Sequence, residues 1–315
     1  MATIIEVRGL TKRYGNLTAL KDMDLTIEEG AIFGFVGPNG AGKTTTMRIL
    51  TTLLRPSSGE AWVAENSILD ERRSVRRIIG YMPDFFGVYG DMKVWEYLDF
   101  FAACYDIPPA KRDRLVSDLL ELVELPHRRD DYVDALSRGM KQRLCLARTL
   151  AHEPQVLILD EPASGLDPRA RIEIRELLSE LQAMGKTIFV SSHILSEISE
   201  ICTHIGIIEA GQLVATGTLA EMRRLIRVQR VVRVTLLERI EEARDWLAAH
   251  PDVMQVEPAA ANHKADLQLT FAGDDEALVD LLSEMVRAKF PVMQFQEEAD
   301  DLEDVFMRLT KGIVS

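Results

Sequence analysis

A glycine-rich segment near residue 40 constrains the fold of this chain more than any other feature. It follows an apolar run at Ala31–Val36 and consists of Gly37, Pro38, Asn39, Gly40, Ala41, Gly42, Lys43, Thr44 and Thr45. Glycines allow backbone N–H groups to converge on phosphate oxygens without Cβ clashes, and a helix that begins near Lys43 presents its positive N-terminal end to the same anion. The segment therefore predicts a strand, a phosphate-binding turn and a helix over Lys43–Thr52.

The order of residues in this segment is that of a nucleoside triphosphate site. Lys43 is expected to reach the β- and γ-phosphates, and the Thr44 hydroxyl is expected to coordinate Mg²⁺. Many unrelated proteins carry such a loop, so by itself it predicts binding of a triphosphate such as ATP and no particular reaction.

Short apolar runs alternate with helical segments over residues 1–222, which predicts one α/β domain. Strands are expected at Ile4–Leu10, Ala31–Val36, Ile78–Met82, Val156–Leu159, Thr187–Ser191 and His204–Ile208, and helices at Lys43–Thr52, Val94–Cys104, Lys111–Val123, Gly139–His152 and Pro168–Met184. Such alternation favours a mainly parallel sheet covered by helices on both faces. Between about residues 84 and 135 the strand pattern disappears, which predicts a helical insert.

Residues 228–315 follow a different pattern, which predicts a small second domain. Strands are expected at Val231–Leu236, Val253–Val256, Leu267–Phe271 and Val292–Phe295, with helices around Ile240–Leu247 and Leu278–Val286. The order βαββαβ is the ferredoxin-like α+β plan. A last helix is expected to carry Leu302, Val305, Phe306 and Leu309. We find no catalytic grouping in this domain, so we expect it to be a packed accessory domain.

Length and charge limit the class of protein. A chain of 315 residues is long enough for two domains, and its net charge of −13 disfavours a general nucleic-acid-binding role. Its three cysteines share no metal-binding spacing and are expected to be reduced packing residues of a cytoplasmic protein. No apolar run approaches the ~20 residues of a membrane-spanning helix, so any membrane path is expected to belong to another chain.

An Asp-Glu pair ends the apolar run Val156–Leu159. A lone carboxylate at the end of a buried strand is costly unless it meets a cation, and Mg²⁺ is the natural partner of Asp160. Glu161, next along the chain, is the candidate for activating the water that attacks the γ-phosphate. The alternative is that the pair only begins a surface loop.

Two segments downstream of the phosphate loop indicate which class of ATPase this is. Leu136-Ser-Arg-Gly-Met140 opens a predicted helix, and Val156-Leu-Ile-Leu-Asp-Glu-Pro162 follows it. In order and spacing they resemble the signature and Walker B elements of the ATP-binding cassette (ABC) family, and the resemblance covers the first 222 residues. It implies a P-loop ABC ATPase domain that hydrolyses MgATP.

The tail adds a narrower resemblance. Asp301-Leu-Glu-Asp-Val-Phe306 is similar to the ending of ATPase subunits of ABC-2-type exporters, such as the daunorubicin-resistance group. This resemblance implies an exporter subunit on the inner face of the cell membrane. Its partners would be a separate transmembrane permease subunit and a second ATPase subunit, expected to form a homodimer, with no nucleic acid bound.

The family resemblance also assigns roles to single residues. His193, which by itself would be read as a structural hydrogen-bonding residue, matches the histidine that contacts the γ-phosphate. Tyr14 matches the aromatic residue that stacks on adenine, although it is also placed to pack on a sheet edge. Ser137 and Gly139 match signature residues that close the site of a second subunit, and Asp167 belongs to a segment that resembles the D-loop along that interface.

The chain departs from the family pattern at three positions. Arg138 and Met140 occupy signature positions where the family has glycine and glutamine, a substitution also found in exporters of the drug-resistance type. Asp84 replaces a glutamine that touches Mg²⁺ and water. A carboxylate can ligate the metal but repels the γ-phosphate, so a metal role and a plain loop role both stay open. An apolar cluster follows Asp84 and consists of Phe85, Phe86, Val88 and Tyr89.

Two other functions fit parts of this pattern. One is an ABC ATPase that acts on nucleic acid, which is disfavoured by the acidic charge and by the absence of a long coiled-coil insertion. The other is a regulatory nucleotide-binding module without turnover, which requires that Asp84 spoil catalysis. The transported substrate leaves no trace in this chain, because the permease would select it.

Overall fold

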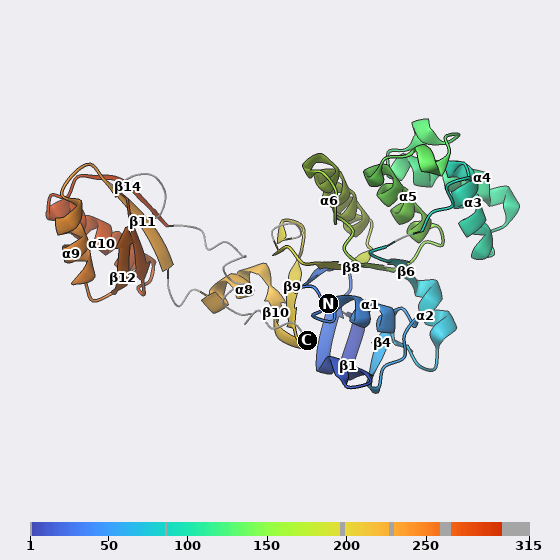
Figure 1. Cartoon of the computed structure of the whole chain (residues 1–315), viewed down its shortest axis with the longest axis horizontal. Coiled ribbons are helices and arrows are strands. Elements are labelled where there is room, and N and C mark those ends of the chain that lie inside the picture. Colours follow the sequence, from blue (N-terminus) through green and yellow to red (C-terminus); the bar gives the residue numbers. More distant parts are fainter. Residues whose placement is uncertain (1, 86, 196–198, 227–229, 259–265, 298–315) are drawn as a thin grey trace. The chain divides into compact units, whose positions relative to one another are not determined.

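The computed structural model describes the chain except residues 1, 86, 196–198, 227–229, 259–265 and 298–315. The expected last helix, with Leu302, Val305, Phe306 and Leu309, and the Asp301–Phe306 ending lie outside the described residues. The described chain forms two compact units, and the boundary between them along the sequence lies between Leu219 and Ala220. Figure 1 shows the elements of each unit.

A six-stranded sheet forms the centre of the first unit. Its order is β10 (Gln212–Thr218), β9 (His204–Glu209), β3 (Ile32–Val36), β8 (Thr187–Ser192), β7 (Val156–Leu159) and β6 (Ile79–Met82). Every pair is parallel except β10 with β9. Strands β3, β7 and β8 are buried at every residue, as expected for the centre of a parallel sheet covered on both faces. The predicted mainly parallel sheet is confirmed.

A second, antiparallel sheet was largely missed by the sequence prediction. It has the order β2 (Leu17–Glu28), β1 (Thr3–Tyr14), β4 (Ser58–Val63) and β5 (Asn66–Ser67). In β2, Met23, Leu25 and Ile27 are buried and alternate with exposed residues, so the period-2 signal was present in the sequence. These side chains share one hydrophobic core with the β3 strand and the α1 helix (Lys43–Leu50).

Helices of the insert form a separate layer at the carboxyl side of β6. They are α3 (Val94–Cys104), α4 (Pro109–Leu122) and the short 3₁₀ turns η1 (Pro126–Arg128) and η2 (Val133–Ala135). Helix α5 (Arg138–Leu150) packs on both α3 and α4, and Figure 1 shows the three helices grouped together, coloured from teal to green. Two more helices in the described part of this unit are α2 (Arg72–Ile78) and α6 (Pro168–Ala183); α2 was not predicted.

The second unit has the predicted ferredoxin-like plan. Its elements are α8 (Leu219–Ile226), β11 (Arg230–Leu236), α9 (Ile240–Ala248), β12 (Val253–Pro258), β13 (Asp266–Phe271), α10 (Asp275–Arg287) and β14 (Val292–Glu297). The sheet is antiparallel, with the order β12–β13–β11–β14. The core of this unit contains Val232, Val234 and Leu236, which alternate along β11, together with Leu247 of α9 and Leu281 of α10. Each of the two helices packs its apolar face on the sheet.

Two of the three cysteines are packing residues as predicted, whereas Cys104 is exposed and the prediction is wrong for it. Cys145 and Cys202 are buried and all three thiols are free. Burial raises the pKa of Cys145 to about 11 and that of Cys202 to about 12, because a thiolate is poorly solvated there. Both are therefore unreactive packing residues near neutral pH.

Among the described residues, no helix has the length and apolar character needed to cross a bilayer.

Candidate nucleotide-binding site

The glycine-rich turn is held tightly between β3 and α1. A Cβ on Gly37 would lie 2.3 Å from the Ile208 carbonyl oxygen, and one on Gly42 would lie 2.8 Å from the Ala19 carbonyl oxygen. Gly42 also has a φ of 112°, in a conformation that side chains rarely adopt. The path of the loop therefore requires glycine at these two positions, and it brings the N-terminus of α1 to the end of the central strand.

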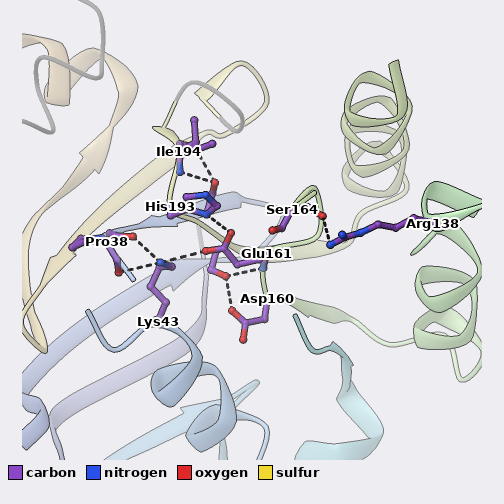
Figure 2. Close-up of polar contacts among 11 residues, drawn as sticks. Pro38, Lys43, Arg138, Asp160, Glu161, Ser164, His193 and Ile194 are labelled. Carbon is purple, nitrogen blue, oxygen red and sulfur yellow. Dashed lines mark hydrogen bonds and ion pairs between the residues drawn. The ribbon is translucent and has the colours of Figure 1, made fainter. Parts of the chain in front are cut away.

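Lys43 carries a buried ammonium group. The residue is only 6% exposed, and its Nζ donates to the carbonyl oxygens of Gly37 at 2.6 Å and Pro38 at 3.3 Å. Glu161 Oε1 lies 3.3 Å from the same nitrogen (Figure 2). A buried cation needs such partners, and each of them can be replaced by an oxygen of a bound phosphate.

Asp160 is buried at the end of β7 and is held from one side. Ser191 at the end of β8 donates its hydroxyl to Asp160 Oδ1 at 2.7 Å, whereas Oδ2 is buried without a hydrogen-bond partner among the described residues. Burial raises the pKa of Asp160, the Ser191 and Thr44 hydroxyls lower it, and the Asp84 and Glu161 carboxylates raise it. A buried carboxylate whose neighbouring charges are two further carboxylates is costly, and a bound cation would offset that cost.

Glu161 links the lysine and the histidine. Its Oε2 lies 2.6 Å from His193 Nδ1, while its Oε1 faces Lys43 (Figure 2). The Glu161 N–H donates to Ser191 Oγ at 2.9 Å, and the residue has a left-handed φ of 53°. A non-glycine residue in this conformation is strained, so the local structure holds this carboxylate at the mouth of the loop.

Lys43, Glu161 and His193 line one cavity of about 240 Å³. It is lined by residues of the glycine-rich loop and of three later segments, namely Asn39, Gly40, Gly42, Lys43, Thr44, Thr45, Asp84, Glu161, Ser164 and His193. Sites for whole drug-sized ligands measure roughly 300–1,000 Å³. The cavity thus matches a triphosphate better than an entire nucleotide, and the base and ribose would lie outside it.

The donor set of the cavity fits a divalent cation that arrives with phosphates. Asp84 and Glu161 line the cavity together with a single lysine, and both carboxylates interact with that of Asp160, so an unaccompanied triphosphate would be repelled. No group of three or more His, Cys, Asp or Glu side chains able to hold a metal occurs in the described part of the chain. Mg²⁺ commonly binds through one or two carboxylates together with substrate phosphates, which is the set available here.

Several predicted site residues do not line this cavity, namely Tyr14, Gly37, Pro38, Ala41, Asp160 and Asp167. Tyr14 ends β1, is 46% exposed, and has the Lys12 ammonium 5.1 Å from its ring centroid. Asp167 is the N-cap of α6, where its carboxylate accepts the Ala170 N–H at 3.0 Å. The single subunit therefore gives Asp167 a structural task, and contacts of Tyr14 or Asp167 with a nucleotide stay predictions.

The signature residues also lie away from their own subunit's cavity. Ser137 is the exposed N-cap of α5, and its Oγ accepts the Met140 N–H at 3.3 Å. A Cβ on Gly139 would lie 3.3 Å from Ala170 Cβ on α6. Because both residues lie at the start of α5, the N-terminus of this helix can contact a ligand that is bound outside this subunit's own cavity.

Sequence reasoning missed Ser191 and Ser164 as parts of the site. Ser191 fixes both Asp160 and Glu161 through one hydroxyl, and Ser164 lines the cavity. The signal for Ser191 was a hydroxyl residue at the end of an apolar strand, next to the strand that ends in Asp160.

Comparison with known proteins identifies the family. The model of the ABC transporter family matches residues 20–164, and that of the ATP-binding protein DrrA1-3-like C-terminal domain matches residues 217–310. The Nod factor export ATP-binding protein I of Ralstonia nicotianae is 33% identical over 308 residues, which cover 98% of this chain and 94% of that protein. The linearmycin resistance ATP-binding protein of Bacillus subtilis is 29% identical, with 98% of each chain covered.

Solved structures that cover about 70% of this chain give the same result. An ATP-binding subunit of an ABC transporter superposes with a TM-score of 0.64 at 31% identity, covering 71% of this chain and 93% of that one. An ATP-binding cassette solved as a dimer with ADP and phosphate has a TM-score of 0.63 at 26% identity, covering 69% and 99%. The chain belongs to the ABC transporter family, as one of its ATP-binding subunits.

We expect Glu161→Gln to bind ATP but to hydrolyse it at least ~10²-fold more slowly, as loss of a general base should. The substitution removes the negative charge without changing the shape of a side chain that faces both Lys43 and His193. ATPase rate and ATP affinity, measured on the same preparation, test this expectation.

Glu153→Gln is a matched control, because Glu153 is an exposed glutamate with a similar left-handed φ of 54°. It should keep the wild-type rate. Near-wild-type hydrolysis by the Glu161 variant would remove Glu161 from the reaction.

Proposed function

We propose that this ATP-binding subunit hydrolyses MgATP and thereby powers an ABC exporter whose membrane path is a separate permease. The observation that carries the proposal is the single cavity in which Lys43, Thr44, Glu161 and His193 meet. The relatives named for Nod factor export and linearmycin resistance support export as the direction of transport.

The residues divide the work of phosphoryl transfer. Lys43 exchanges its loop carbonyls for the β- and γ-phosphates, and the N-terminus of α1 adds its N–H groups. Glu161 accepts a proton from the attacking water, and His193, fixed through its Nδ1 contact with Glu161, presents its other ring nitrogen towards the γ-phosphate. Thr44 and Asp160 would hold Mg²⁺, which when bound neutralises charge on the phosphates.

A second copy of the subunit completes each site. The cavity of one subunit covers only the phosphate part of a nucleotide, while Ser137 and Gly139 lie at an exposed helix start outside it. In our proposal the two copies face each other so that each signature helix contacts the ATP held by the other. The related cassette solved as a dimer with ADP and phosphate supports this arrangement.

The permease is proposed to dock beside the helical insert. A groove of about 410 Å³ there is lined by apolar and basic side chains that include Leu53, Arg76, Phe101, Tyr105 and Arg148. This docking would place the subunit on the cytoplasmic face of the membrane.

Tyr89, which follows Asp84, is linked to this groove through Phe100, whose ring centroid lies 5.2 Å from that of the groove residue Phe101. Phe85 is 87% exposed, whereas Tyr89 packs edge-on against Phe100 at 5.8 Å; Phe86 lies outside the described residues. Exposed aromatic side chains of this kind favour a protein partner.

The two domains take separate tasks in this proposal. Residues 1–222 contain every proposed phosphate contact, and residues 228–315 form an accessory domain without a catalytic group. The proposal includes no nucleic-acid partner, because the chain is acidic. It includes no purely regulatory role, because the carboxylate, histidine and lysine needed for turnover meet in one cavity.

Asp84 is proposed to act as a partner of Mg²⁺ or of its bound water. Asp84 lines the cavity and acts on the pKa of Asp160 through its charge. We expect Asp84→Ala to raise the Mg²⁺ concentration needed for half-maximal ATPase rate, with little change in Mg²⁺-free ATP binding. Asp84→Gln should restore much of the rate, because an amide oxygen can contact the metal without repelling the γ-phosphate.

Mg²⁺ titrations of the three proteins, each with a parallel measurement of ATP affinity, distinguish the two readings of this residue. Identical rates and identical metal dependence in all three would make Asp84 an ordinary loop residue.

The shared site is tested by mixing two inactive subunits. Lys43→Ala removes the phosphate-binding ammonium, and Ser137→Arg blocks the signature. In a mixed dimer one site has both defects and the other has neither, so we expect the ATPase activity to return on mixing. Absence of rescue in dimers proven to be mixed would contradict the proposed shared site.

A further inference from the structure

Arg138, which departs from the family pattern, contacts the turn that follows Glu161. Its Nη2 donates to the Ser164 carbonyl oxygen at 3.1 Å (Figure 2). A Cβ built on Gly165 would lie 2.5 Å from Arg138 Cζ, so the guanidinium lies directly against the glycine backbone. Because Ser164 lines the nucleotide cavity, this side chain joins the signature segment to the rim of its own subunit's site.

The turn formed by residues 161–166 is held in place independently of Arg138. The Ser164 N–H donates to the Glu161 carbonyl oxygen at 3.1 Å, and the Leu166 N–H donates to that of Ala163 at 3.4 Å. Ala163 and Leu166 are both buried, so the turn is held by its own hydrogen bonds and by the core. Arg138 is exposed at the start of α5, and its side chain therefore tethers the helix start to the turn.

The body of α5 is attached to the same region by other residues. Gln142, which is buried, donates its Nε2 to the Pro162 carbonyl oxygen, and Gly139 packs close to Ala170. These contacts hold the helix in the absence of the arginine. Loss of Arg138 is therefore expected to free the first turn of α5, with Ser137 at its N-cap, while the fold stays intact.

We propose that Arg138 is a positioning residue that holds the signature turn in the place where it meets the ATP of the second subunit. Glycine, the family's usual residue at this position, has no side chain to make this tether. The arginine acts through Ser137 and Gly139 and so affects the partner's site, while the site of its own subunit keeps its lysine, glutamate and histidine. This inference rests on the proposed shared site.

A mixed dimer with one intact site tests the direction of the effect. One subunit carries Lys43→Ala and supplies the intact signature; the other carries Ser137→Arg and supplies the intact phosphate loop. Arg138→Ala is then added to either subunit. In the Lys43→Ala subunit it should lower kcat about 10-fold, because a misplaced reacting geometry costs rate, with KM for ATP changed less than about two-fold. Arg138→Ala added to the Ser137→Arg subunit should change neither kcat nor KM.

Two further variants separate positioning from structure. Arg138→Lys should recover much of kcat, because its ammonium can donate to the same Ser164 carbonyl. Arg114→Ala is the control, because Arg114 is an exposed arginine whose ion pair with Asp118 lies on one helix; it should leave kcat unchanged. Melting temperatures should match across the set.

The outcomes separate this inference from the proposed function. Equal losses with Arg138→Ala in either subunit, or no loss in either, would overturn the positioning role while the parent mixed dimer stays active. A parent mixed dimer without activity would contradict the shared site, and this inference with it.

Discussion

The structure of the site depends on the burial of one ammonium group. Lys43 is satisfied by carbonyl oxygens of the loop that carries it and by Glu161, and this set resembles the oxygens that a triphosphate would supply. The glycines are needed because the loop passes against the neighbouring strand, and Glu161 is held in a strained conformation opposite the lysine. Without a nucleotide, Lys43 and Glu161 therefore form an ion pair with each other, and a bound phosphate can take the place of Glu161 beside the lysine.

The surrounding sheet explains how distant segments meet at this ammonium. Strands β3, β7 and β8 are neighbours and parallel, so their carboxyl ends bring together the glycine-rich loop, the Asp160–Glu161 pair and His193. Ser191 ties two of these ends with a single hydroxyl. The signature segment opens α5, which packs on the helices of the insert, and Arg138 tethers this segment to the turn after Glu161.

Much of this arrangement was predictable because the motifs are short and local. The glycine-rich loop, the apolar strand before Asp160 and the ferredoxin-like order each follow from neighbouring residues. The β2 strand was missed although it follows β1 across only two residues and carries a period-2 pattern. The β4 strand was missed because its partner β1 is distant in sequence, and Ser191 was missed because its role depends on which strands are adjacent. The tether of Arg138 to Ser164 joins residues 26 positions apart, and no pattern in the sequence reports such a contact.

The most direct test of this account is a crystal structure of the protein with Mg²⁺ and a non-hydrolysable ATP analogue. Lys43 Nζ should leave the Gly37 carbonyl oxygen and Glu161 Oε1 and lie about 2.7–2.9 Å from phosphate oxygens, the usual length of a charge-assisted hydrogen bond. The γ-phosphate should lie next to His193. An analogue bound at another place, with the Lys43 contacts unchanged, would contradict the claim that the internal ion pair occupies the position of the phosphates.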